Sequence, residues 1–252
     1  MLATQTFGDD DRRPPILIVH GLFGSGRNWG VIAKRLADAR RVVTVDMRNH
    51  GDSFHADSQS YADMAGDLDH VIAEIGGRAD VIGHSMGGKA AMVLALERPE
   101  RLRRLVVADI APVAYDHSQS GLIAAMQRLD LGPVETRGDA DRALAEDIET
   151  ASVRAFLLQS LDVKARRWRL NLEVLDREMT RITGFPDVSG QFDGPALFLA
   201  GAQSDYVTPE ARPKIKALFP NAKQAKIPGA GHWLHAEKPR EFEAAVRAFL
   251  NG

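Results

Sequence analysis

The residues Gly83-His84-Ser85-Met86-Gly87 place a serine between two glycines, directly after an apolar run and directly before an alanine-rich helical pattern. A G-x-S-x-G sequence in this setting is typical of a sharp strand-to-helix turn that raises the serine hydroxyl above the edge of a sheet. The glycines let neighbouring backbone approach closely, and the start of a helix favours an anion that forms beside it. The alternative is an ordinary turn serine. The context favours Ser85 as a nucleophile.

A serine hydroxyl needs a general base to act as a nucleophile near neutral pH. The chain has eight histidines, and His232 lies in a glycine-rich turn, GAGHWLHAEKP, between the last expected strand and the last expected helix. Loops at the carboxyl edge of a parallel sheet are where ligand sites gather. His235 is a weaker alternative in the same turn, and His84 is expected to point away from its neighbour, the serine. We therefore predict that His232 is the base.

The segment HGLFGSGRNW at 20–29 follows the first long apolar run, and its glycines allow backbone N–H groups to turn toward the nucleophile. By position, the N–H groups of Leu22 and Met86 would bind the oxyanion of a tetrahedral intermediate. Losing one such donor typically costs about 3–4 kcal/mol of transition-state stabilisation. A phosphate-binding loop is the competing interpretation, but the segment lacks a GK[ST] ending and the G-x-G-x-x-G pattern with its downstream acidic residue.

Two aspartates could orient His232 and stabilise its protonated form. Asp109, in VVADIAP, ends the expected strand that follows the nucleophile's helix, and Asp205 lies in LAGAQSDYVTP after a later strand. Both positions lie at the histidine's edge of a parallel sheet. Asp109 could instead be a strand-end acid, and Asp205 could be the acid of an Asx turn. The residue pattern alone leaves both open.

Short apolar runs alternate with helical patterns through the first part of the chain. Such uninterrupted β-branched runs are typical of strands that are covered on both faces of a parallel sheet. The expected strands are 15–21, 41–47, 79–85 and 102–110, and the expected helices between them are 28–38, 61–76 and 87–99. Strand and helix in repetition predict right-handed crossovers and a doubly wound, mostly parallel α/β sheet.

From about residue 112 to residue 190 the strand candidates disappear and helical patterns take over. We expect a helical stretch over 163–182, with one apolar stripe and an opposite, solvated arginine face. The stripe comprises Trp168, Leu172, Leu175, Met179 and Ile182. Strands then return at 195–201 and 222–229, with helices at 208–219 and 238–250. The expected organisation is a core from 1–111 and 191–252, interrupted by a helical cap at 112–190.

The bulk composition excludes several classes of protein and site. The chain has 252 residues, of which 44% are hydrophobic and 26% charged, and its net charge is −2. Neither sign of charge dominates, so nothing indicates a nucleic-acid or membrane-surface binder. Cysteine is absent, which excludes disulfides and thiolate metal sites. No signal-peptide pattern or apolar run of about 20 residues is present, and we expect a soluble, cytoplasmic protein.

Five segments in order resemble the α/β-hydrolase superfamily over essentially the whole chain, and within it the small YbfF-type esterases and their mitochondrial abhydrolase relatives. These segments are VHGLFGSGRNW, DMRNHGDS, GHSMGGKA, DIAPVAY and GAGHWLHAEKP. The resemblance implies a hydrolase core, a cap over an acyl pocket and no cofactor. In most superfamily members the acid lies three residues beyond a glycine after the cap, where this chain has Ser204. The YbfF-like group implies the earlier position, so we favour Asp109 over Asp205.

Together these features predict a serine carboxylesterase that hydrolyses short- to medium-chain acyl esters, or acyl thioesters, through Ser85, His232 and Asp109. Phe23 and Trp233 are the expected substrate contacts, and no metal is expected. Alternatives are a lipase, a C–C hydrolase, a perhydrolase, or, in another class, a ligand receptor with little turnover, because fold does not fix function. The expected partner is a small acyl ester rather than a nucleic acid or a membrane. The sequence does not distinguish between a monomer and a dimer.

Overall fold

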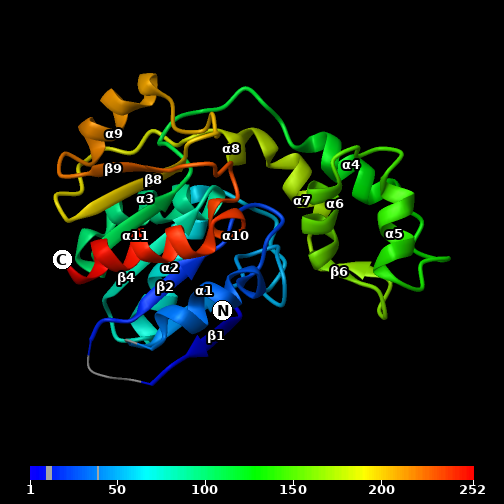
Figure 1. The fold of residues 1–252 in the computed structure, drawn as a ribbon, viewed down its shortest axis with the longest axis horizontal. Coiled ribbons are helices and arrows are strands. Elements are labelled where there is room, and N and C mark those ends of the chain that lie inside the picture. Colours follow the sequence, from blue (N-terminus) through cyan, green and yellow to red (C-terminus); the bar gives the residue numbers. More distant parts are fainter. Residues whose placement is uncertain (10–12, 39) are drawn as a thin grey trace.

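The computed structural model describes residues 1–9, 13–38 and 40–252, and these residues build a doubly wound α/β fold around one large sheet (Figure 1). The sheet has seven strands in the order β1-β3-β2-β4-β5-β8-β9. Its strands are β1 (Thr4–Phe7), β2 (Ile16–Val19), β3 (Val42–Val45), β4 (Ala79–His84), β5 (Leu102–Ala108), β8 (Ala196–Gly201) and β9 (Lys223–Ile227). Only the edge pair β1–β3 is antiparallel within this described sheet. The expected fold class is confirmed.

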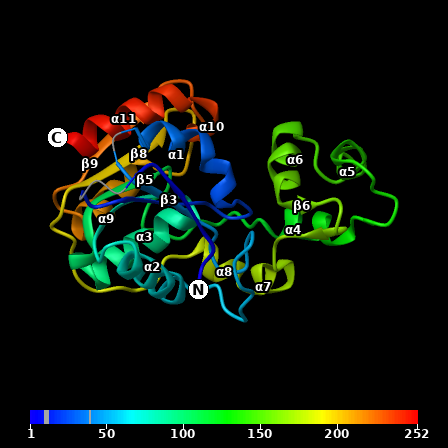
Figure 2. The same cartoon turned by 90° about the horizontal axis from the view of Figure 1, so that it is seen from below.

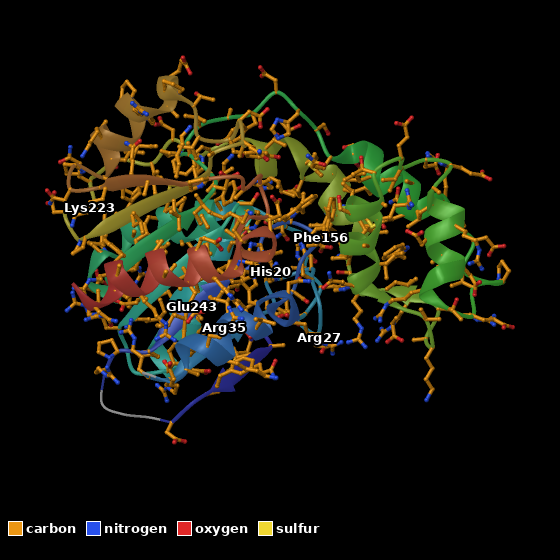
Figure 3. The ribbon with its side chains drawn as sticks, in the orientation of Figure 1. His20, Arg27, Arg35, Phe156, Lys223 and Glu243 are labelled. Carbon is orange, nitrogen blue, oxygen red and sulfur yellow. The ribbon has the colours of Figure 1, made fainter. Side chains whose placement is uncertain are left out.

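Successive strand residues point to opposite sides of the sheet, so both faces present apolar side chains. Helices cover each face. Ile16 and Ile18 of β2 pack in the apolar cluster of α1 (Gly30–Leu36) and α11 (Pro239–Asn251). The alternate residues of β2 pack in the cluster of α2 (Tyr61–Glu74), α3 (Met86–Glu97) and α9 (Arg212–Leu218). Arg35 of α1 and Glu243 of α11 form an ion pair at 3.3 Å, which joins the two helices of the first face (Figure 3).

The chain between β5 and β8 leaves the sheet and builds a separate group of short elements. Two perpendicular views show α4, α5, α6 and β6 as a body beside the sheet (Figures 1 and 2). The elements are α4 (Ser120–Arg128), α5 (Arg137–Leu144), α6 (Ala151–Leu157), β6 (Leu161–Asp162), β7 (Arg167–Trp168), α7 (Leu172–Arg177) and α8 (Met179–Thr183). We call residues 112–190 the cap, after its expected role. Its exact boundaries stay a prediction.

The expectation of one helical stretch over 163–182 is wrong. Leu161–Asp162 and Arg167–Trp168 pair as an antiparallel hairpin, and Arg166 in its turn has a positive φ of 51°. Helix begins only at Leu172 and divides into α7 and α8. The apolar stripe is nevertheless inside: Leu175 is fully buried, and the Trp168 indole N–H donates to the carbonyl of Met126 in α4 at 2.9 Å. The stripe residues therefore face the interior as expected, but they belong to a hairpin and two short helices instead of one helix.

Four single-turn 3₁₀ helices and one short α-helix complete the described chain. The 3₁₀ turns are Gly26–Trp29, Pro99–Arg101, Leu158–Ser160 and Pro209–Ala211, and the short helix is α10 (Leu234–Glu237). The first turn leads from the loop after β2 into α1, and α10 lies between β9 and α11. The loops after β2, β4, β5, β8 and β9 thus all open at the carboxyl edge of the parallel strands. Ligand sites of open α/β sheets form at this edge.

Candidate active site

Ser85 lies at the junction between β4 and α3, in a backbone conformation that is rare for a residue with a side chain. Its φ is 50° and its ψ is −121°, a region that costs of order 1–3 kcal/mol for a non-glycine residue. Its own N–H donates to the carbonyl of Ala108 at 3.1 Å, and its carbonyl accepts from the N–H of Lys89 at 3.0 Å. Strand and helix therefore hold the strained turn from both sides, and the serine side chain reaches the cavity wall.

The glycines on either side of Ser85 are required by close backbone packing. A Cβ atom at Gly83 would lie 2.5 Å from the carbonyl oxygen of Gly87. A Cβ atom at Gly87 would lie 2.4 Å from the carbonyl oxygen of His20, in the loop after β2. Both clashes are with backbone, which cannot rotate away. The G-x-S-x-G spacing thus lets the turn, the helix and the loop after β2 meet.

Replacing Gly87 with alanine is expected to lower the free energy of unfolding by about 3 kcal/mol or more, because the new methyl group would overpack rigid backbone. Gly66, inside α2, is the matched control, since a Cβ there would meet nothing within 4 Å. Gly66→Ala should instead stabilise the protein by about 0.5–1 kcal/mol through the lower entropy of the unfolded chain. Urea unfolding followed by circular dichroism measures both. Equal stability of the two variants would contradict the packing argument.

The structure brings Ser85, His232 and Asp109 into one hydrogen-bonded row. His232 Nε2 lies 3.1 Å from Ser85 Oγ, and His232 Nδ1 lies 2.8 Å from Asp109 Oδ2. A carboxylate only accepts, so Nδ1 carries the proton toward Asp109 and Nε2 is left to accept the serine hydroxyl. The serine hydroxyl comes from the end of β4, the carboxylate from the end of β5 and the imidazole from the turn before α10.

Asp109 is fully buried and also has a strained backbone, with φ at 52°. Its Oδ1 accepts the N–H of Gly201 at 2.8 Å, and its Oδ2 accepts the hydroxyl of Ser204 as well as His232. Asp205, the alternative acid, is an exposed residue of the loop after β8. No role was predicted for Ser204 from the sequence, and its hydroxyl here donates a hydrogen bond to Asp109.

Two further residues hold His232, one at its imidazole and one at its backbone carbonyl. The ring of Tyr206 stacks on the imidazole, with centroids 3.8 Å apart and an interplanar angle of 17°. The carbonyl oxygen of His232 accepts a hydrogen bond from Nε2 of the buried His84 at 2.9 Å. Burial lowers the pKa of His84 well below its usual range, with further repulsion from His232 and His235. His84 therefore stays neutral and holds the turn that carries His232 through the backbone carbonyl of that residue.

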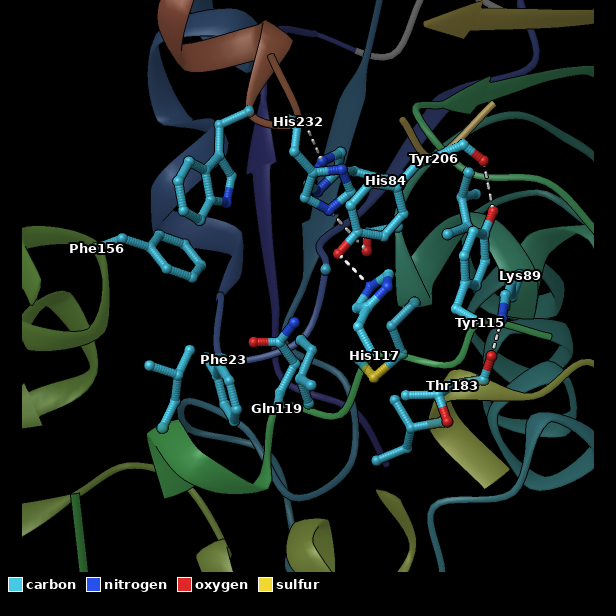
Figure 4. Close-up of a pocket in the computed structure, with 18 of the residues that line it drawn as sticks. Phe23, His84, Lys89, Tyr115, His117, Gln119, Phe156, Thr183, Tyr206 and His232 are labelled. Atoms are coloured by element: carbon cyan, nitrogen blue, oxygen red, sulfur yellow. Dashed lines mark hydrogen bonds between the residues drawn. The ribbon is translucent and has the colours of Figure 1, made fainter. Parts of the chain in front are cut away.

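A cavity of about 310 Å³ opens beside Ser85, between the core and the cap (Figure 4). The predicted residues Leu22, Phe23, Met86 and Trp233 all contribute to its wall. Phe156 of α6 packs against Trp233, with ring centroids 5.4 Å apart, and points from the cap toward the core (Figure 3). Most of the other lining residues are apolar or aromatic. Apolar walls around a few polar groups are typical of a site for a small organic ligand.

Lys89, one helical turn after Ser85, lies in the wall of this cavity on the side opposite Phe156 (Figure 4). Its ammonium donates to the carbonyl of Thr183 at 2.8 Å and to that of Gly184, at the end of α8, and lies 4.6 Å from the centre of the Tyr115 ring. Burial lowers its pKa to about 7. Lys89 was not predicted as a site residue, although it is the single charged residue in the otherwise apolar run 86–96.

The weaker histidine candidate, His235, lies in the core rather than in the cavity wall. It is buried and stacks on Trp29 with ring centroids 4.0 Å apart. Burial lowers its pKa to about 3, with a smaller contribution from repulsion by His232. Trp29 is itself 1% exposed, in agreement with the expectation that it packs in the core. Both residues support the turn that carries His232.

In residues 1–9, 13–38 and 40–252, no group of three or more histidine, aspartate or glutamate side chains is arranged to hold a metal ion. Within the same part of the chain, none of the helices combines the length and apolar character that crossing a bilayer demands.

Comparison with known proteins identifies relatives over the full chain. A family model described as "alpha/beta hydrolase fold" matches residues 14–239. An sn-1-specific diacylglycerol lipase, ABHD11, from Mus musculus is 42% identical over 99% of this chain and 85% of its own length. Esterase YbfF from Escherichia coli is 39% identical over 99% of this chain and 98% of its own. A solved marine microorganism esterase superposes with a TM-score of 0.93 at 39% identity, covering 98% of both chains.

Proposed function

Because this chain belongs to the α/β-hydrolase fold family, we propose that it is a serine carboxylesterase that cleaves acyl esters through Ser85, His232 and Asp109. The row of hydrogen bonds from Ser85 Oγ through the imidazole to the Asp109 carboxylate is the observation that carries this proposal. Two of the relatives are named as a lipase and an esterase. Both names describe enzymes that cleave carboxylic esters, which supports the same chemistry here.

In the proposed reaction, Ser85 Oγ attacks the acyl carbon while His232 Nε2 takes the hydroxyl proton. The N–H groups of Leu22 and Met86 stabilise the negative charge that develops on the carbonyl oxygen. The ester C–O bond then breaks, and His232 returns the proton to the departing alcohol. Water attacks the acyl-enzyme by the same route, with His232 as base, and releases the carboxylic acid. Asp109 holds the tautomer and stabilises the imidazolium in both halves.

The cavity between core and cap supports a substrate with a short to medium acyl chain. Its walls are mostly apolar, its volume is about 310 Å³, and Phe23 and Trp233 are proposed to contact the substrate. An acyl thioester presents the same acyl carbon, so it is a possible second substrate of the same site. The Asp109 hydrogen bond to His232 favours Asp109 as the acid, and the exposed position of Asp205 favours a surface role for that residue.

Two measurements test the proposed nucleophile. A fluorophosphonate probe should label the protein with one equivalent on the peptide that contains Ser85, and the purified protein should hydrolyse p-nitrophenyl acetate and butyrate. Ser85→Ala should do neither. Longer p-nitrophenyl esters, diacylglycerols and acyl thioesters then define the substrate range. A wild-type protein that neither labels nor hydrolyses, or activity that survives in Ser85→Ala, would rule out the serine esterase and favour a receptor role.

A further inference from the structure

Phe23, the residue after the proposed oxyanion donor Leu22, is held at both ends of its backbone by side chains from elsewhere in the chain. It is 3% exposed, and its φ of 64° is strained for a bulky residue. Its N–H donates to Nε2 of His50 at 3.2 Å. Its carbonyl accepts the hydroxyl of Ser160 at 2.7 Å. Such a conformation persists only where the surroundings fix it, and here two partners do so.

His50 is suited to this contact because it is neutral and has a fixed tautomer. It is fully buried, and its Nδ1–H donates to the carbonyl of Arg48 at 2.8 Å, so the lone pair of Nε2 faces Phe23. Burial, with smaller repulsion from His20, lowers the pKa of His50 to about 3. The imidazole is therefore an acceptor across the pH range in which a histidine base works.

The segment around His50 holds the loop after β2 at two more points. The N–H of Met47 donates to Nε2 of His20 at 2.9 Å, and the N–H of Gly26 donates to Asp46 Oδ1 at 2.7 Å. The segment is the DMRNHGDS motif at 46–53, which the proposed reaction does not use. The Asp46 carboxylate and the Met47 N–H of this motif thus support the loop that carries Leu22.

The cap contacts both this segment and Phe23. Gly51 donates its N–H to the carbonyl of Arg169 at 2.8 Å, and Asn171 donates its N–H to the carbonyl of Asn49 at 3.0 Å. Ser160 itself belongs to the cap, in the turn between α6 and β6. Residues 158–171 of the cap therefore reach the loop after β2 directly, through Ser160, and indirectly, through residues 49–51.

We propose that His50 and Ser160 are positioning residues that fix Phe23, and through it the Leu22 N–H, so that the oxyanion site is fully formed only when the cap is docked. This inference rests on the proposed acyl transfer at Ser85. Its physical basis is that Leu22 and Phe23 share a rigid peptide unit, so a change in the φ of Phe23 is transmitted to the backbone of Leu22. Release of Phe23 from its strained φ would turn the preceding peptide units and move the Leu22 N–H away from the developing oxyanion.

The test compares Ser160→Ala with Arg177→Met. Arg177 is a matched cap residue, since it donates to the core carbonyl of Asp57 at 2.7 Å without contacting Phe23. Complete loss of an oxyanion donor typically costs about 10²–10³-fold in kcat, and a displaced donor should cost less. We expect Ser160→Ala to lower kcat about 10-fold at nearly constant KM, and to weaken binding of a trifluoromethyl ketone, which mimics the tetrahedral oxyanion, by a similar factor. Arg177→Met should change neither value more than about twofold.

A second pair tests His50 itself. His50→Gln keeps an acceptor near the N–H of Phe23, whereas His50→Leu does not, so the glutamine variant should recover most of the kcat and ketone affinity that the leucine variant loses. Unchanged kcat in Ser160→Ala, a change in KM alone, or equal losses in Arg177→Met would each overturn the inference while leaving the esterase proposal intact. A wild-type protein without fluorophosphonate labelling or hydrolysis would overturn the esterase proposal first.

Discussion

Asp109→Asn is expected to lower kcat for p-nitrophenyl butyrate by about 10⁴-fold, because an amide in this position favours the wrong imidazole tautomer. The buried Asp109 carboxylate accepts Nδ1–H of His232 at 2.8 Å. An asparagine could present its NH₂ group there, which would push the proton to Nε2 and remove the acceptor for Ser85. Ser85→Ala and His232→Ala should cost more, about 10⁶-fold each, since each removes the nucleophile or its base.

Asp205→Asn is the matched control for this series. Asp205 lies four residues after Gly201 on the exposed loop, and its replacement should change kcat by less than about threefold, as a surface substitution away from the reacting atoms. Thermal unfolding of each variant separates lost chemistry from lost fold. A 10⁴-fold loss in Asp205→Asn together with an active Asp109→Asn would exchange the roles of the two aspartates.

The protein is expected to lose about 5 kcal/mol of unfolding free energy between pH 7.5 and pH 5.5 through its buried histidines. Burial lowers the pKa of His20 to about 4, of His50 to about 3 and of His235 to about 3, and lowers that of His84 well below its usual value. In the unfolded chain all four titrate near 6.5. Below that pH the unfolded state binds protons that the folded state excludes, so stability falls as the solution is acidified.

This loss is large against a typical total of about 5–15 kcal/mol, and urea unfolding at pH 7.5, 6.5 and 5.5 measures it. His235→Phe keeps an aromatic ring on Trp29 and removes one titrating group, so it should reduce the pH-dependent loss by about a quarter. The same pH dependence in His235→Phe and in the wild type would show that this residue does not contribute.

Much of the core could be predicted from the sequence, because strands that are buried on both faces leave uninterrupted apolar runs. The runs at 15–21, 79–85 and 102–110 coincide with β2, β4 and β5. β1 was missed, since Thr4–Phe7 is mostly exposed and pairs along one edge only, so it carries no such run. The hairpin β6–β7 was also missed, because two-residue strands are too short for any periodicity to register.

Fewer of the contacts around the site could be predicted from the sequence. Ser85 and His232 each stand in a local sequence pattern that indicates a function, and the structure places His232 Nε2 3.1 Å from Ser85 Oγ. The hydrogen bonds from Ser204 to Asp109 and from Ser160 to Phe23 join residues 95 and 137 positions apart. Neither serine differs in sequence from an ordinary loop serine. Only the folded arrangement shows what their hydroxyl groups contact.

The position of Asp109 at the end of β5 has a consequence for how this scaffold can diversify. The carboxylate that His232 contacts lies before the cap in the chain, so the loop after β8 supplies only auxiliary groups, the hydroxyl of Ser204 and the ring of Tyr206. Insertions or sequence changes near 205–208 would then alter the wall of the cavity around Tyr206 without removing the carboxylate that His232 contacts. Laboratory evolution toward new leaving groups should accept changes in that loop far more readily than at the end of β5.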